Sequence, residues 1–136
     1  MNNKLELTQR CVLLLAGALL LMVSASILIS PIGFYAANNI ELGSNTSLIS
    51  ELKAPAGFLL LAGGFMISSL FVRRYQDTAT CLAAVIYLSY ALSRVISMGV
   101  DGVPSSGLVQ AAIIEAVLGI CCVVILATHQ LLARKS

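Results

Sequence analysis

Four long apolar stretches constrain the fold of this chain more than any other feature of its sequence. They are Cys11 to Ile29, Ala56 to Val72, Thr80 to Met98 and Leu108 to Thr128. Each is close to the roughly 20 residues that a helix needs to cross about 30 Å of hydrocarbon. The sequence therefore predicts a membrane protein that crosses the bilayer with helices.

The composition supports this prediction and limits the number of domains. Of the 136 residues, 59% are hydrophobic and 10% are charged, whereas soluble domains carry about 25% charged residues. The tails and loops that remain are too short for a separate soluble domain. We expect a single all-α domain over residues 1–136, an integral membrane four-helix bundle with helices at about 11–29, 51–72, 78–98 and 107–129.

Six of the eight lysines and arginines gather at one end of the expected bundle. They are Lys4, Arg10, Arg73, Arg74, Arg134 and Lys135, with His129 nearby. By the positive-inside rule, both termini are expected in the cytoplasm, and the loops around residues 30–50 and 99–107 are expected outside. The first apolar run is longer than the core of a signal peptide, so we expect an uncleaved first helix.

A short segment after the first apolar stretch is expected at the membrane boundary. Pro31 suits the first turn of a new helix, and the residue before a proline is pushed away from helical conformation. We therefore expect a short interfacial helix or loop between the first two membrane helices. Phe34 and Tyr35 would lie there at headgroup depth.

The next two membrane helices have candidate N-caps in the sequence. Ser50 is the expected cap of the second helix, with Glu51 in its first turn and Pro55 near its start. Asp77 or Thr78 is expected to cap the third.

Small residues predict where helices approach closely. Gly57 and Gly64 share one stripe of the second helix, which predicts a neighbouring backbone on that side. Gly119 and Cys122 belong to a similar stripe on the fourth helix, expected to face the third.

Charged side chains within the apolar stretches mark the candidate site. Arg94 lies in the third stretch and Glu115 in the fourth, and a short turn joins the two. Ionisable residues inside membrane segments are costly and usually face protein or a water-filled cavity. Polar residues recur around Arg94 on one side of its helix, namely Tyr87, Tyr90, Ser97 and Asp101. Glu51 and Lys53 enter from the same side of the membrane and complete the predicted cluster.

Two interpretations of this cluster remain open. Arg94 and Glu115 could form an interhelical ion pair that fixes helix register, in a scaffold or accessory subunit that holds a membrane protein partner. Alternatively, Arg94 binds a lipid or a small anionic ligand in a polar pocket in the outer half of the bundle. Two tyrosines and a serine beside the pair favour the pocket, because an ion pair alone does not require them.

Other classes of function find little support in the sequence. It has no Ser/His/Asp set, HExxH motif or glycine-rich phosphate loop, and we expect no catalytic residues, no metal site and no cofactor. Whether the protein is an enzyme stays open, although the sequence favours a protein without catalytic activity. The four cysteines lack CxxC spacing and are expected to be packing residues. The net charge of +2 is too small to indicate nucleic acid as a partner.

Two segments resemble a known family. SELKAPAGFLLLAGGF is similar to the start of the second helix in the small bacterial four-helix membrane proteins of the domain-of-unknown-function 4345 family. YALSRVISMGVDGVPSSGLVQAAIIEAVLG resembles the helical hairpin of that family, with its intramembrane glutamate. Carried over residue by residue, the family pattern marks Glu51, Lys53, Gly57, Arg94, Asp101, Gly102, Pro104 and Glu115. In this chain Ser93 stands where the family usually has glycine, and Lys53 where arginine is common.

The resemblance implies a protein of the bacterial inner membrane and no established activity. The architecture is also similar, more loosely, to DoxX-like four-helix proteins. The expected partners are membrane lipids, with a small anionic ligand or a membrane protein as further candidates.

Overall fold

The computed structural model describes residues 3–133, and this part of the chain is helical without strands. The elements are α1 (Asn3–Ile29), α2 (Pro31–Ala36), α3 (Thr46–Ser69), the short 3-10 helix η1 (Arg73–Tyr75), α4 (Gln76–Val100) and α5 (Ser106–Ala133). The four long helices form one bundle, and α2 is the short helix expected after Pro31. The predicted all-α fold class is confirmed.

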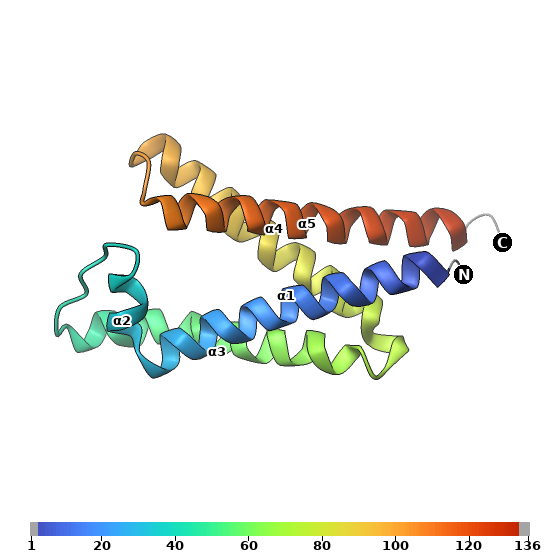
Figure 1. Ribbon diagram of the computed structural model, residues 1–136, viewed down its shortest axis with the longest axis horizontal. Coiled ribbons are helices and arrows are strands. Elements are labelled where there is room, and N and C mark those ends of the chain that lie inside the picture. The colour runs from blue at the N-terminus through green and yellow to red at the C-terminus, as the bar shows by residue number, and fades with distance from the viewer. Residues whose placement is uncertain (1–2, 134–136) are drawn as a thin grey trace.

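The long helices pair as two hairpins (Figure 1). In the first hairpin α1 packs along α3, and in the second α4 packs along α5. The start of α1, η1 and the end of α5 lie at one end of the molecule, called here the terminal end, and α2 and the α4–α5 turn lie at the opposite end, called the loop end. Helix α4 contacts both helices of the first hairpin, whereas α3 and α5 do not pack against each other within residues 3–133. The hairpins diverge toward the loop end.

Helix α1 ends at Ile29, as the sequence predicted, but most other helix ends lie at other residues than predicted. Helix α1 begins at Asn3 rather than near residue 11, and α5 continues to Ala133. Helix α3 begins at Thr46, because the side chain of Asn45 accepts a 3.1 Å hydrogen bond from the Leu48 amide and caps the helix. Helix α4 extends from Gln76 to Val100, outside the predicted 78–98.

These bounds correct the predicted caps. Ser50 lies inside α3, Glu51 lies beyond its first turn, and Pro55 lies in the helix interior rather than near its start. Neither Asp77 nor Thr78 is the N-cap of α4, because the η1 turn leads directly into the helix at Gln76.

The first hairpin is held by a close approach of two glycines. A Cβ atom added to Gly63 would lie 3.0 Å from the carbonyl oxygen of Gly17, and one added to Gly17 would lie 3.1 Å from the carbonyl oxygen of Gly63. The backbones of α1 and α3 therefore touch at this point, as small residues permit. A Cβ on Gly57 or Gly64 would meet nothing within 4 Å. The prediction that the stripe with Gly57 and Gly64 faces a neighbouring backbone was therefore wrong.

The second hairpin uses small residues in the way the sequence predicted. Gly119 and Cys122 are buried on the side of α5 that packs in the bundle. A Cβ on Gly119 would lie 2.6 Å from two side-chain atoms of Leu88 on α4. All four cysteines are free thiols, and Cys122 is fully buried in the core.

The outer surface of the bundle is apolar. Large hydrophobic side chains such as Leu14, Phe58, Val85 and Val117 are exposed, one on each long helix. All four long helices have the length and hydropathy needed to cross a membrane. The exposed apolar surface matches hydrocarbon, in which a lipid-facing side chain is stable.

Candidate functional site

The candidate site is built around an ion pair between the two helices of the second hairpin. Arg94 Nε on α4 donates to Glu115 Oε2 on α5 at 2.8 Å, and Arg94 Nη2 donates to Glu115 Oε1 at 3.2 Å. Two parallel bonds of this kind fix the guanidinium relative to the carboxylate. The side chains remain 28% and 14% exposed, so the pair is not sealed inside protein.

The pair lies on the wall of a cavity between the two hairpins. The cavity has a volume of about 490 Å³ and draws residues from all four long helices and from α2. Its polar lining residues are Tyr35, Asn38, Tyr87, Tyr90, Arg94, Gln110 and Glu115. The opposite wall, from α1 and α3, is apolar and includes Leu19, Val23 and Leu59. The volume falls within the about 300–1,000 Å³ of typical small-molecule sites.

The three tyrosines of the cavity differ in how their hydroxyls are bonded. The Tyr87 hydroxyl donates to the backbone carbonyl of Ala16 at 2.7 Å and is thereby engaged in helix packing. The hydroxyls of Tyr35 and Tyr90 have no hydrogen-bond partner within residues 3–133. Burial raises the pKa of Tyr35, and the nearby charge of Arg94 opposes this shift. Tyr35 and Tyr90 thus line the cavity with hydroxyls that are free of hydrogen bonds to the described residues.

Four residues of the predicted cluster lie outside the cavity. Ser97 donates to Asp101 at 2.9 Å, one turn apart on α4, and both are exposed. Asp101 is the C-cap of α4 and follows directly after the candidate membrane span, which ends at Val100. Glu51 is exposed and Lys53 is half-buried on α3, but neither lines the cavity. The structure thus brings Tyr87, Tyr90, Arg94 and Glu115 together and leaves the others apart.

Other cavity residues were not predicted. Tyr35 was expected at the membrane boundary, and nothing in the sequence indicated that α2 folds back toward Arg94. Asn38 follows α2 and lies against the start of α5, where a Cβ on Gly107 would be 2.6 Å from Asn38 Oδ1. Gln110 could have been predicted, because it is a polar side chain within the apolar stretch that also contains Glu115.

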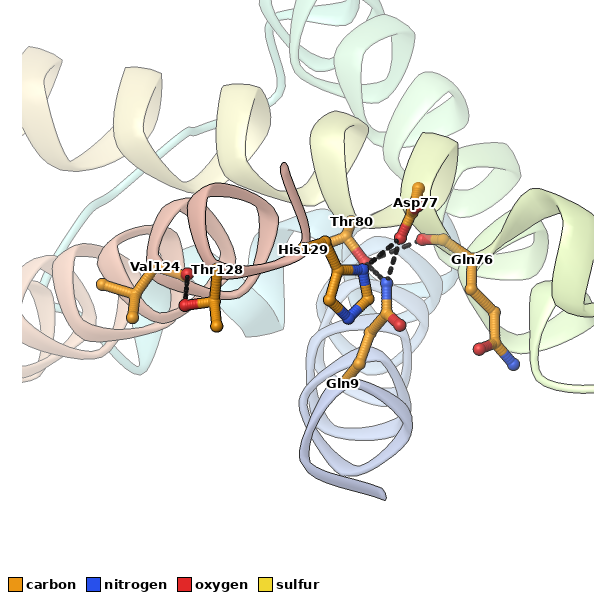
Figure 2. A network of polar contacts seen from close by, with 7 residues as sticks. All are labelled: Gln9, Gln76, Asp77, Thr80, Val124, Thr128 and His129. Atoms are coloured by element: carbon orange, nitrogen blue, oxygen red, sulfur yellow. Dashed lines mark hydrogen bonds and ion pairs between the residues drawn. The ribbon is translucent and has the colours of Figure 1, made fainter. Parts of the chain in front are cut away.

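A second polar cluster joins three helices at the terminal end (Figure 2). Asp77 Oδ1 on α4 accepts from Gln9 Nε2 on α1 at 2.8 Å and contacts His129 Nδ1 on α5 at 3.0 Å. Gln9 Nε2 also donates to Thr80 Oγ1 at 3.0 Å, and Thr80 in turn donates to the carbonyl of Gln76 at 2.7 Å.

The sequence did not predict this contact, because His129 was expected to mark only the end of its helix. Gln9 and Thr80 are buried, and the hydrogen bond between them pairs polar groups that are costly to bury without a partner. Thr80 donates its hydroxyl proton to the Gln76 carbonyl on its own helix. We interpret the cluster as a set of contacts that stabilises the packing of the two hairpins.

Fold and surface together define the class of this protein. It is a multi-pass membrane protein built as a four-helix bundle, with an ion pair on the wall of a cavity between its two hairpins. The chain belongs to the DUF4345 family, a domain of unknown function, whose family model matches residues 8–126. No curated protein and no solved structure matches the chain.

Proposed function

We propose that this protein binds an amphiphilic molecule, a lipid or a small anionic compound, in the cavity between its hairpins. The observation that carries the proposal is the state of the Arg94 side chain. Arg94 uses two of its five N–H groups for Glu115, and the remaining groups have no partner within residues 3–133. Hydrogen-bond donors on the wall of a membrane cavity are costly to leave unmade, so they favour a ligand with acceptor atoms.

The two walls of the cavity suit the two parts of an amphiphile. Arg94, with the hydroxyls of Tyr35 and Tyr90, offers donors to a polar head. The apolar side chains from α1 and α3, such as Leu19 and Leu59, offer contact to a hydrocarbon chain. Because the hairpins diverge toward the loop end, such a molecule would enter from the membrane with its head at that end.

The expected orientation supports the same proposal. Lys4, Arg10, Arg73 and Arg74 lie at or near the terminal end, which by the positive-inside rule is cytoplasmic. The cavity then opens in the outer half of a bacterial inner membrane. Catalysis is not part of the proposal, because His129 lies at the terminal end, away from the cavity.

Native mass spectrometry of the purified protein tests this proposal. The wild type should carry a small amphiphile that Arg94→Gln loses. Arg74→Gln is the matched control, because it removes the same charge from an exposed position outside the cavity and should keep the ligand. If wild type and Arg94→Gln carry the same partner protein and no small molecule, the scaffold function is correct and the binding function is wrong.

A further inference from the structure

The charged groups on the cavity wall sum to zero. Among the described residues that line the cavity, Arg94 and Glu115 are the charged ones, and each neutralises the other. The cavity is otherwise lined by apolar side chains and by neutral hydroxyl and amide groups. In such surroundings a net charge is far more costly than in water, because the effective dielectric constant is low.

This balance limits the charge of a bound molecule. An anionic head on Arg94 would leave the site with a net charge of about −1, since Glu115 already neutralises the guanidinium. A cationic head on Glu115 would leave the opposite excess. A head group that carries one positive and one negative charge, or no charge, keeps the net charge of the site at zero.

Both members of the pair have capacity for a second partner. Arg94 retains N–H donors beyond the two that reach Glu115. Each oxygen of Glu115 accepts one bond from Arg94 and keeps a further lone pair, so the carboxylate can also attract a positive charge that carries no N–H donor. An acidic group could therefore bind Arg94 while an ammonium group of the same head binds Glu115.

We infer that the cavity selects an amphiphile with a zwitterionic head; this inference rests on the proposed function. Its acidic group lies on Arg94, its ammonium group lies near Glu115, and its chain lies against Leu19, Val23 and Leu59. Simple fatty acids and alkyl sulfates are not preferred ligands under this inference, because their heads carry a net negative charge. A phosphate monoanion joined to an amine, as in the heads of common phospholipids, has the required charges.

The test uses three probes that share one dodecyl chain and differ in charge. They are dodecylphosphocholine, dodecanesulfonate and dodecyltrimethylammonium, each added at low mole fraction to the protein in dodecyl maltoside micelles. Bound probe is counted by native mass spectrometry. The wild type should retain about tenfold more of the zwitterion than of either ion, because each ion leaves an unbalanced charge.

Two variants should move this preference in opposite directions. Glu115→Gln gives the site a positive charge and should shift it toward dodecanesulfonate, whereas Arg94→Gln should shift it toward dodecyltrimethylammonium. Circular dichroism identifies a variant that fails to fold, and the other variant then tests the inference alone. Preferred binding of dodecanesulfonate by the wild type, or an unchanged preference in a folded variant, overturns the inference but leaves amphiphile binding intact. Binding of none of the probes overturns the proposed function as well.

Discussion

The hydroxyl of Tyr87 on α4 donates a 2.7 Å hydrogen bond to the backbone carbonyl of Ala16 on α1. Both residues are buried in the core, and the bond crosses from one hairpin to the other. Tyr87 also lines the cavity, so one side chain both joins the hairpins and forms part of the wall between them.

Removing this hydroxyl tests its contribution. Tyr87→Phe should lower the free energy of unfolding by about 1 kcal/mol, because it removes one buried hydrogen bond and keeps the ring. Unfolding in dodecyl maltoside micelles, followed by circular dichroism, measures the change. Tyr75→Phe is the control, since Tyr75 is exposed and its hydroxyl has no bond within residues 3–133. Equal losses in the two variants would show that the Tyr87 bond contributes nothing.

Adjacent glycines on α3 offer a matched pair for the helix contact. Gly63→Ala should lower stability by about 2 kcal/mol, because its Cβ would lie 3.0 Å from the Gly17 carbonyl and backbone atoms must move. Gly64→Ala adds a Cβ in open space and should be neutral or slightly stabilising, since alanine favours the helix. Denaturant unfolding of both variants checks the order. A larger loss for Gly64→Ala would contradict the contact.

The Arg94–Glu115 pair should behave as a coupled unit. Arg94→Ala or Glu115→Ala alone should each lower stability by about 2 kcal/mol or more, because a charge is left without its partner. The double variant should lose less than the sum of the two, since it removes both charges. A double-mutant cycle of unfolding free energies in detergent measures the coupling. Strictly additive losses would show that the 2.8 Å contact is not energetically coupled.

The terminal-end cluster should stabilise the packing of the two hairpins. His129→Ala should lower stability by about 1 to 2 kcal/mol, because it removes the contact to Asp77 and leaves a small cavity. Thr128→Ala is the neighbouring control, since its hydroxyl donates only to Val124 on its own helix. Thermal unfolding of the two variants gives the comparison. A control as destabilised as His129→Ala would mean that the cluster has no special role.

The N-cap of α3 is Asn45 in the structure, whereas the sequence predicted Ser50. Asn45→Ala should lower stability by about 1 kcal/mol, because the Leu48 amide loses its acceptor. Ser50→Ala should have little effect, since Ser50 is exposed inside the helix. The reverse order in unfolding experiments would place the helix start near residue 51, as first predicted.

The apolar stretches predicted four membrane helices because hydrocarbon requires long uncharged segments. The contact of Arg94 with Glu115 followed from the same constraint, since two charges in adjacent helices joined by a short turn can meet. The rotation of each helix was harder to predict. Whether Gly63 or Gly64 faces α1 depends on about 100° of helix rotation, and α3 is too uniformly apolar to show it.

Contacts between distant segments were not accessible from the sequence. Tyr35 lines the cavity because α2 packs against α1 and α3 at the loop end, and no periodicity of the sequence indicates this placement. Asp77 and His129 are 52 residues apart, and each has an ordinary explanation at a helix end. Their meeting follows from the relative placement of the hairpins, which depends on many small packing contacts.

The pairing of α1 with α3 and of α4 with α5 has a consequence for how the chain is made. Both partners in each hairpin are neighbours among the membrane helices, so each pair closes a short loop at low entropic cost. During synthesis the first hairpin is complete before α4 leaves the ribosome, and independently inserted helices associate afterwards in the bilayer. We therefore expect the first hairpin to form first, the second next, and the docking of the two last. Because its walls come from both hairpins, the cavity is expected to form last, when the two hairpins dock.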